Sequence, residues 1–254
     1  MLEISSVENS LIKDLKKLKD KKYRQKNKMF IAEGYKFLDY TDNICYILIR
    51  EDISTNKSIL EKIKNINCEK IKLTEKVYKS LSSQVNSQGI IVVYSKKDYN
   101  NNLSNNIVVL DEITDPGNLG TIIRIIDAVG IKDLILTENS VDVYNEKVIR
   151  STMGSIFSAN IIYMSKKELI NYLLANKYNV ITTKLIDKSV SYTDMKISDK
   201  NAFVFGNESR GVSDELSYIS SQNIVIPIYG NAESLNVSVA AAIILYKFRE
   251  IKKG

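Results

Sequence analysis

Residues 223–246 read NIVIPIYGNAESLNVSVAAAIILY. An apolar strand ends at Pro227, the chain turns at Tyr229-Gly230-Asn231, and an apolar, alanine-rich helix then runs from Val237 to Tyr246. Proline fixes φ and glycine accepts positive φ, so this pair indicates a loop whose shape matters. Ser234 stands just before the helix, where it could simply be an N-cap. By itself, the segment predicts a strand, a shaped loop and a helix.

Two other loops share this composition. Both prolines of the chain and seven of its ten glycines lie between Asp115 and Gly230. One loop reads DPGNLG from Asp115 to Gly120, and the other reads FGNESRG from Phe205 to Gly211. Each follows an apolar strand, and ligands of parallel α/β sheets bind beyond the carboxyl ends of strands. We therefore expect the chemistry of the protein at these three loops.

The sequence around these loops predicts an α/β domain. Apolar strands, each followed by a helical stretch, are expected at residues 107–110, 133–136, 179–183, 202–205 and 223–228. Strands that alternate with helices indicate a mostly parallel sheet covered on both faces.

The first part of the chain predicts a second, smaller α/β domain. Shorter strands are expected at residues 29–33, 44–49, 69–73 and 90–94, with helices between them. The stretch around residue 100 is polar, rich in asparagine and without periodicity, which is typical of a linker. We therefore expect domains at residues 1–98 and 107–254, joined by a linker at 99–106.

Composition excludes several classes of function. The chain of 254 residues contains no histidine, which removes imidazole acid–base chemistry and histidine metal sites. Its two cysteines, Cys45 and Cys68, are too few for a disulfide framework or a thiolate metal site, so we expect no metal. No apolar run approaches the roughly 20 residues that span a bilayer, and the start of the chain lacks a signal-peptide layout. A cytoplasmic protein with no membrane partner is expected.

Positive charge is concentrated in one segment. Residues Lys13 to Lys28 include nine lysines or arginines and two aspartates, a net charge of +7, whereas the whole chain carries +6. Leu11, Leu15 and Leu18 give this segment the apolar stripe of a helix. The opposite face is either merely solvated or follows the phosphates of a nucleic acid. Its candidate RNA-binding residues are Lys16, Lys17, Lys21 and Lys22.

Ordinary nucleotide-binding motifs do not fit these loops. The DPGNLG loop lacks both the G-x-G-x-x-G dinucleotide fingerprint and the Gly-Lys-Ser/Thr of a P-loop. A nucleotide-dependent oxidoreductase on a doubly wound sheet is therefore a disfavoured alternative. Arg124, in the helix after this loop, could also form a plain surface ion pair with Asp127 or Glu112.

Together, the three loops resemble the signature motifs of the SpoU (TrmH) family of RNA ribose 2′-O-methyltransferases. The resemblance rests on DPGNLG with Arg124, on Gly206-Asn207-Glu208 with Gly211, and on Ile226-Pro227 with the segment from Glu233 to Ala240. It implies a trefoil knot at the carboxyl end, S-adenosylmethionine bound among the knotted loops, and a homodimer. Chain-connection rules alone would exclude a knot. Residues 30–34 (FIAEG) and the basic segment are similar to the RNA-binding domain of members that act on large-subunit ribosomal RNA.

The resemblance also implies roles for individual residues. Catalytic roles fall on Asn118, Arg124, Glu208, Ser234 and Asn236. Cofactor contacts fall on Gly206, Ile226, Leu235 and Ser234, and an RNA contact falls on Arg150. Arginine almost never loses its proton in proteins, so Arg124 acts either as an unusual base or as a group that positions a phosphate.

These observations lead to one expected function and its alternatives. We expect an S-adenosylmethionine-dependent enzyme that methylates a ribose 2′-hydroxyl in structured RNA, with 23S ribosomal RNA favoured as the substrate. The alternatives are a transfer RNA 2′-O-methyltransferase and a non-catalytic RNA-binding protein. The sulfonium of the cofactor is already electrophilic, so the reaction needs no metal.

Overall fold

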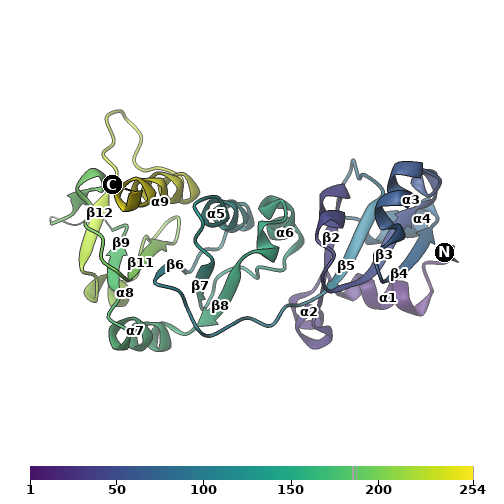
Figure 1. Ribbon diagram of the computed structural model, residues 1–254, viewed down its shortest axis with the longest axis horizontal. Coiled ribbons are helices and arrows are strands. Elements are labelled where there is room, and N and C mark those ends of the chain that lie inside the picture. Colours follow the sequence, from purple (N-terminus) through teal and green to yellow (C-terminus); the bar gives the residue numbers. More distant parts are fainter. Residues whose placement is uncertain (185, 187, 254) are drawn as a thin grey trace. The chain divides into compact units, whose positions relative to one another are not determined.

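A computed structural model describes residues 1–184, 186 and 188–253 (Figure 1). The chain forms two compact units. The first unit comprises Met1–Asp98 together with Asp142–Phe157, and the second comprises Tyr99–Val141 together with the chain from Ser158 onward.

The described residues of the first unit form a five-stranded mixed sheet in the order β1-β4-β3-β5-β2. Pairs β1–β4 and β3–β4 are parallel, whereas β3–β5 and β2–β5 are antiparallel. The four strands expected from the sequence are confirmed. The strand β1 has only three residues, too few for an apolar pattern to predict it. The strands are β1 (Leu2–Ile4), β2 (Met29–Glu33), β3 (Ile44–Arg50), β4 (Glu69–Leu73) and β5 (Ile90–Ser95).

The helices of the first unit pack on this sheet. They are α1 (Ser10–Lys17), α2 (Lys21–Asn27), α3 (Lys57–Lys64), α4 (Glu75–Leu81) and α6 (Glu146–Thr152). The apolar stripe of the basic segment is buried as expected, because Leu15 and Leu18 join a core with Val77, Leu48 and Val93. The segment is divided into α1 and α2, since Asp20 caps α2 by accepting a hydrogen bond from the Lys22 N–H at 2.9 Å.

The segment Asp142–Phe157 belongs to the first unit by its contacts, although the sequence pattern predicts it within the second domain, 107–254. Its Phe157 ring stacks on Tyr40 with centroids 4.5 Å apart. At its start, Asp142 Oδ2 lies 2.7 Å from Arg24 Nη2, and the two side chains are only 10% and 4% exposed. These partners are more than 100 positions apart, so no local sequence pattern signals their contact.

The described residues of the second unit form a seven-stranded sheet in the order β10-β12-β9-β11-β6-β7-β8. Every pairing in it is parallel, which confirms the expected sheet type. Its strands are β6 (Asn106–Asp111), β7 (Asp133–Thr137), β8 (Asn160–Met164), β9 (Asn179–Thr182), β10 (Val190–Ser191), β11 (Asn201–Gly206) and β12 (Gln222–Val225). The strands β8 and β10 are not among those expected from the sequence.

Helices cover both faces of this sheet. Figure 1 shows α5 (Pro116–Ala128) and α9 (Val237–Lys253) on one face and α7 (Lys166–Ala175) and α8 (Asp214–Tyr218) on the other. The α5 and α9 helices pack against each other. The polar stretch at residues 99–106 is held against the second unit, because the Ser104 N–H donates to Asp133 Oδ2 at 2.9 Å and Tyr178 Oη donates to the Ser104 carbonyl at 2.6 Å.

Candidate active site

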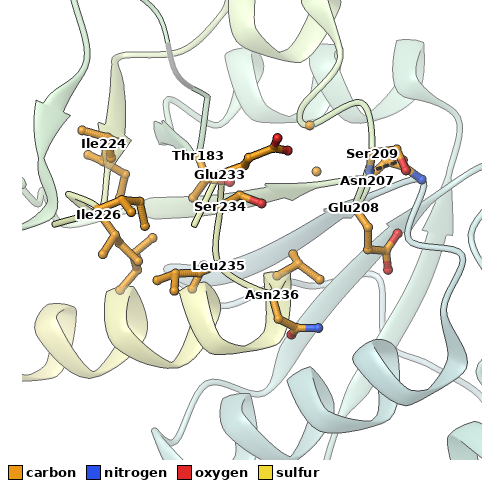
Figure 2. Close-up of a pocket in the computed structure, with 17 residues that line it drawn as sticks. Thr183, Asn207, Glu208, Ser209, Ile224, Ile226, Glu233, Ser234, Leu235 and Asn236 are labelled. Atoms are coloured by element: carbon orange, nitrogen blue, oxygen red, sulfur yellow. Dashed lines mark hydrogen bonds between the residues drawn. The ribbon is translucent and has the colours of Figure 1, made fainter. Parts of the chain in front are cut away.

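The three shaped loops converge at the carboxyl edge of the second sheet. They follow β6, β11 and β12, and the parallel direction of these strands brings their ends to one edge. A cavity of about 680 Å³ lies there, within the range of small-molecule sites. Its lining includes Gly206, Glu208, Ile226, Ser234, Leu235 and Asn236 (Figure 2).

The loop after β11 is a closed turn in which glycine is required. The backbones of Asn207 and Gly211 exchange hydrogen bonds of 3.1 and 2.8 Å, and Gly211 has a φ of +68°. A Cβ atom at Gly206 would lie 2.0 Å from the carbonyl carbon of Gly211. The loop is therefore tightly closed, and its residues 206–209 and 211 line the cavity.

The cavity has an apolar side and a polar side. Figure 2 shows Ile224, Ile226 and Leu235 together on one side, with Glu208 and Asn236 across from them. Ile224 is buried, whereas Leu235 is 37% exposed. An apolar wall beside a few placed polar groups is typical of a cofactor site.

A network of hydrogen bonds connects three of the predicted catalytic residues. Asn118 Nδ2 donates to Glu208 Oε1 at 2.9 Å, and Asn236 Nδ2 donates to Asn118 Oδ1 at 2.9 Å. The Asn118 backbone is fixed in turn, because its N–H donates to Asp115 Oδ1, the N-cap of α5, at 2.7 Å. One residue from each motif thus takes part in a single network.

Asn236, and not Ser234, satisfies the first turn of α9. Its Oδ1 accepts hydrogen bonds from the Ser238 N–H at 2.9 Å and from Ser238 Oγ at 2.6 Å. Ser234 is exposed, lines the cavity and makes no hydrogen bond within the described part of the chain. The simple N-cap explanation for Ser234 is therefore wrong, and its hydroxyl faces the cavity without a partner among the residues that the structure describes.

Arg124 lies apart from this network. It is exposed on α5 and makes no hydrogen bond or ion pair with any residue that the structure describes. The surface ion pair with Asp127 or Glu112 is therefore not formed. Arg124 does not line the 680 Å³ cavity either.

The predicted RNA-binding residues lie in the first unit. Arg150, on α6, lines a hollow of about 180 Å³ with Lys19, Lys147 and Asn145, which the sequence analysis did not connect. These residues come from position 19 and from positions 145–150, which are too far apart in the sequence for a local pattern to predict that they meet.

The lysines of the basic segment differ in their surroundings. Lys21 and Lys22 are exposed in the first turn of α2, and Lys16 is half-buried. Lys17 lies 2.8 Å from Asp14, and this hydrogen bond raises the pKa of Lys17. Lys17 is thus already partly neutralised by an acidic neighbour.

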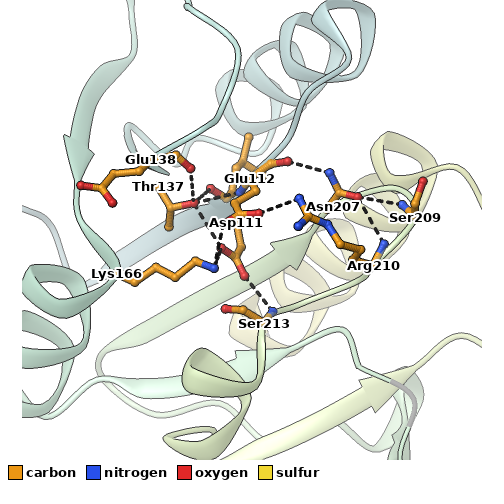
Figure 3. Close-up of polar contacts among 10 residues, drawn as sticks. Asp111, Glu112, Thr137, Glu138, Lys166, Asn207, Ser209, Arg210 and Ser213 are labelled. Atoms are coloured by element: carbon orange, nitrogen blue, oxygen red, sulfur yellow. Dashed lines mark hydrogen bonds and ion pairs between the residues drawn. The ribbon is translucent and has the colours of Figure 1, made fainter.

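A charged cluster that the sequence pattern does not predict lies beside the cavity. It contains Asp111, Glu112, Lys166 and Arg210 (Figure 3). The hydrogen bond from Lys166 lowers the pKa of Glu112, and the positive charges of Lys166 and Arg210 act in the same direction. The only sequence signal was an acidic pair directly after an apolar strand.

The described residues were also compared with the requirements of a membrane-spanning helix and of a metal site. None of the described helices is both long and apolar enough to cross a membrane. Within the described residues, no group of three or more Cys, Asp or Glu side chains is arranged to hold a metal ion, and both cysteines are free thiols.

Comparison with known proteins decides the family. Residues 105–246 match the SpoU rRNA Methylase family, and residues 9–92 match the MRM3-like substrate binding domain. This chain belongs to the SpoU rRNA methylase family. The resemblance drawn from the three loops is thereby confirmed.

Individual relatives of this SpoU-family chain extend the comparison. It is 32% identical to the 23S rRNA (guanosine(2553)-2'-O)-methyltransferase RlmP of Bacillus subtilis, over 98% of this chain and 100% of the relative. It is 34% identical to the tRNA (guanosine(18)-2'-O)-methyltransferase of Aquifex aeolicus, over 56% of this chain and 67% of the relative. The crystal structure of AdoMet-bound rRNA methyltransferase from Sinorhizobium meliloti is similar with a TM-score of 0.86 and 28% identity, over 98% of this chain and 97% of that one.

Proposed function

We propose that this chain uses S-adenosylmethionine to methylate a ribose 2′-hydroxyl of 23S ribosomal RNA. The observation that carries the proposal is the network of Asn118, Glu208 and Asn236 at the edge of the 680 Å³ cavity, because it unites the three family motifs. The relative from Bacillus subtilis, which acts on 23S rRNA, aligns along nearly the whole chain and supports this substrate.

The residues of the cavity fit S-adenosylmethionine. Gly206, which has only backbone atoms, lines the cavity, and Ile226 and Leu235 offer apolar contact to a planar base. Ser234 adds a hydroxyl that has no hydrogen-bond partner in the described part of the chain and can bond to a ligand. When bound, the cofactor supplies an electrophilic methyl group on a sulfonium, without need of a metal.

The chain must position a weak nucleophile without histidine. Arg124 presents an exposed guanidinium with no partner among the described residues, and such a group can bind a phosphate with two hydrogen bonds. We assign it the positioning of the phosphate beside the target ribose, with proton acceptance as the second role to be tested. Asn118 and Asn236 orient the ribose, and Glu208 holds Asn118 in place.

We assign RNA binding to residues 1–98 and methyl transfer to residues 107–254, with 99–106 as the connection. The match of residues 9–92 to a substrate binding domain supports the first assignment. Its proposed phosphate contacts are Lys16, Lys17, Lys21, Lys22 and Arg150. Since Arg150 folds with the first unit, we include residues 142–157 in the RNA-binding part.

A trefoil knot is part of the proposal. The β12 strand is separated from β6 by β9 and β11, yet the α9 helix that follows it packs against α5, which follows β6. Residues 226–236 must therefore return across the carboxyl edge of the sheet, as a knotted chain would.

We also propose a homodimer located in the cytoplasm, where ribosomal RNA is modified. Val239 and Tyr246 are 46% and 54% exposed, and their spacing of seven residues places them on one face of α9. This apolar face is suited to packing against a second copy. Sedimentation should give a particle of about twice 28.8 kDa, and a fully active monomer at micromolar concentration would contradict the dimer.

Mapping of 2′-O-methyl groups tests the function. RNA from a strain that lacks the protein should lose one methyl group in 23S rRNA and regain it when the gene is restored. Loss of a transfer RNA methyl group instead would favour the second candidate, which the Aquifex aeolicus relative supports. Unchanged methylation of both RNAs would indicate a non-catalytic RNA-binding protein. Calorimetric titration with S-adenosylhomocysteine and then with NADH separates the methyltransferase from an oxidoreductase.

A further inference from the structure

Glu112 stands directly after β6 in an unusual backbone conformation. Its φ is +57°, in the left-handed region that glycine enters freely and other residues enter at a cost in free energy. Such residues persist where the surrounding contacts fix them, and they concentrate at functional sites. The contacts of this residue therefore have to explain why a glutamate stands there.

Glu112 is held by polar contacts with several other elements (Figure 3), and one of them is its backbone N–H, which donates to Thr137 Oγ1 on β7 at 2.8 Å. Lys166 Nζ lies 2.8 Å from Glu112 Oε1, and Arg210 Nη2 donates to Glu112 Oε2 at 2.8 Å. Its backbone carbonyl accepts a hydrogen bond from Asn207 Nδ2, also at 2.8 Å. Two of these partners, Asn207 and Arg210, belong to the loop after β11.

The preceding residue holds the other end of the same loop. The Asp111 side chain is 2% exposed, and its Oδ2 accepts a hydrogen bond from the Ser213 N–H at 2.8 Å. Its Oδ1 accepts from Thr137 Oγ1 at 3.1 Å and lies 3.6 Å from Lys166 Nζ. Asp111 and Glu112 thus fasten residues 207 to 213 to the end of β6.

The opposite side of this loop forms the cavity. Gly206, Asn207, Glu208, Ser209 and Gly211 line it, and Glu208 accepts the hydrogen bond from Asn118. The loop is therefore held by Glu112 on one side and presents the cofactor wall on the other. Any shift of the loop would move this wall.

We propose that Glu112 is a positioning residue that holds the 207–213 loop in the conformation which binds the cofactor. The inference rests on the proposed function, because it takes the 680 Å³ cavity to be the S-adenosylmethionine site. An ordinary surface ion pair would not account for the contacts: the Glu112 side chain is only 15% exposed and bridges cations from two different elements. Glycine would suit the backbone better, so the carboxylate is what the position requires.

Two substitutions separate the carboxylate from the backbone strain. Glu112→Ala removes the carboxylate and keeps the strain, whereas Glu112→Gly removes both. We expect the dissociation constant for S-adenosylhomocysteine to rise about tenfold in both variants, while Glu112→Gly unfolds at a higher temperature than Glu112→Ala. Wild-type affinity in Glu112→Gly would overturn the proposal.

Kinetic constants distinguish positioning from general destabilisation. In Glu112→Gly, KM for S-adenosylmethionine should rise, whereas KM for RNA should stay within about twofold of wild type. Glu112→Gln keeps one acceptor oxygen and should fall between wild type and Glu112→Gly. Equal increases in both KM values would overturn the proposal.

Arg210 provides an independent variant, because its side chain is 70% exposed and its loss does not open the core. Arg210→Gln should weaken S-adenosylhomocysteine binding by a few-fold, and adding Glu112→Gln should weaken it less than the two separate effects predict. Full additivity would overturn the proposal.

The matched control is Glu75→Gln, which breaks the exposed Glu75–Lys79 pair of α4 in the first unit. It should leave cofactor affinity unchanged, and an equal loss there would overturn the proposal. Failure of the wild-type protein to bind S-adenosylhomocysteine at all would instead overturn the proposed function.

Discussion

Asn236 donates a hydrogen bond to Asn118 across 2.9 Å, and this contact joins the start of α9 to the first turn of α5, although the two residues lie 118 positions apart in the sequence. Because Asn118 donates onward to Glu208, its amide is held at both ends. A side chain held in this way is preorganised before substrate arrives, which lowers the entropic cost of reaching the reactive geometry.

The network gives a first prediction, for Asn118→Asp. The new carboxylate cannot donate to Glu208, and the two negative charges would repel each other at hydrogen-bond distance. We expect kcat/KM for methyl transfer to fall at least tenfold, a barrier increase of about 1.4 kcal/mol. Single-turnover assays with radiolabelled cofactor measure this. Asn118→Ala, which removes the amide without adding charge, should lose less activity, and the reverse order would contradict the role of the network.

A second prediction concerns Arg124→Ala. Because Arg124 is proposed to position the phosphate beside the target ribose, its removal should abolish methyl transfer. Because the side chain is exposed and lies outside the cavity, the affinity for S-adenosylhomocysteine should stay within a few-fold of wild type. Asn236→Ala should also abolish methyl transfer. Calorimetry and methylation assays on the same preparations check both parts. Turnover above about one tenth of wild type, a loss smaller than roughly 1.4 kcal/mol, would remove Arg124 from the proposed site.

A third prediction concerns the basic segment. Each phosphate contact that is removed should reduce the slope of log affinity against log salt by about 0.7 to 0.9. Replacing Lys16, Lys17, Lys21 and Lys22 by glutamine should therefore weaken RNA binding and flatten its salt dependence, with cofactor affinity unchanged. The slopes are measured by salt titration of RNA binding.

The control for that variant removes the same charge elsewhere in the first unit. Lys57, Lys64, Lys76 and Lys79 are exposed on α3 and α4, and their replacement by glutamine should leave most of the slope intact. Equal slopes in the two quadruple variants would mean that the basic segment is merely solvated.

A fourth prediction is the pH dependence contributed by Glu112. The hydrogen bond from Lys166 holds the pKa of Glu112 below its usual value of 4.5, so the folded state favours the ionised carboxylate. The stabilisation should be complete above about pH 5 and should disappear as the pH falls through the lowered pKa. Melting temperatures of wild type and Glu112→Gln should therefore converge in acid. A difference that widens on acidification would contradict this assignment.

Much of the fold follows from sequence pattern, since apolar runs such as 107–110 and 202–205 have the length and spacing of buried parallel strands. The convergence of the three loops followed as well, because strands of a parallel sheet end at one edge. What could not be predicted are contacts across long separations. The joining of Asp142–Phe157 to the first unit depends on Arg24, Tyr40 and Phe30, and nothing near residue 142 reveals it.

At the site, the sequence indicates that Asn118, Glu208 and Asn236 gather, but not their roles in packing. Asn236 was expected to act in catalysis, and the structure shows that it also satisfies the start of α9. From the sequence, Glu112 is expected only as a partner for Arg124, because its side-chain and carbonyl contacts come from α7 and from the loop after β11, which lie far along the chain.

The inclusion of residues 142–157 in the first unit has a consequence for how the protein is made. During synthesis, the segment up to Asp98 leaves the ribosome with Arg24 lacking its carboxylate and Phe30 lacking its aromatic neighbours Tyr144 and Phe157. The unpaired guanidinium of Arg24 and the exposed aromatic ring of Phe30 favour association with other chains. The first unit can therefore be completed only after residue 157 has emerged, when part of the second unit has already been synthesised. A fragment that ends at residue 98 should aggregate. Because the first unit is built from two separate segments of the chain, no single cut can separate it from the second unit.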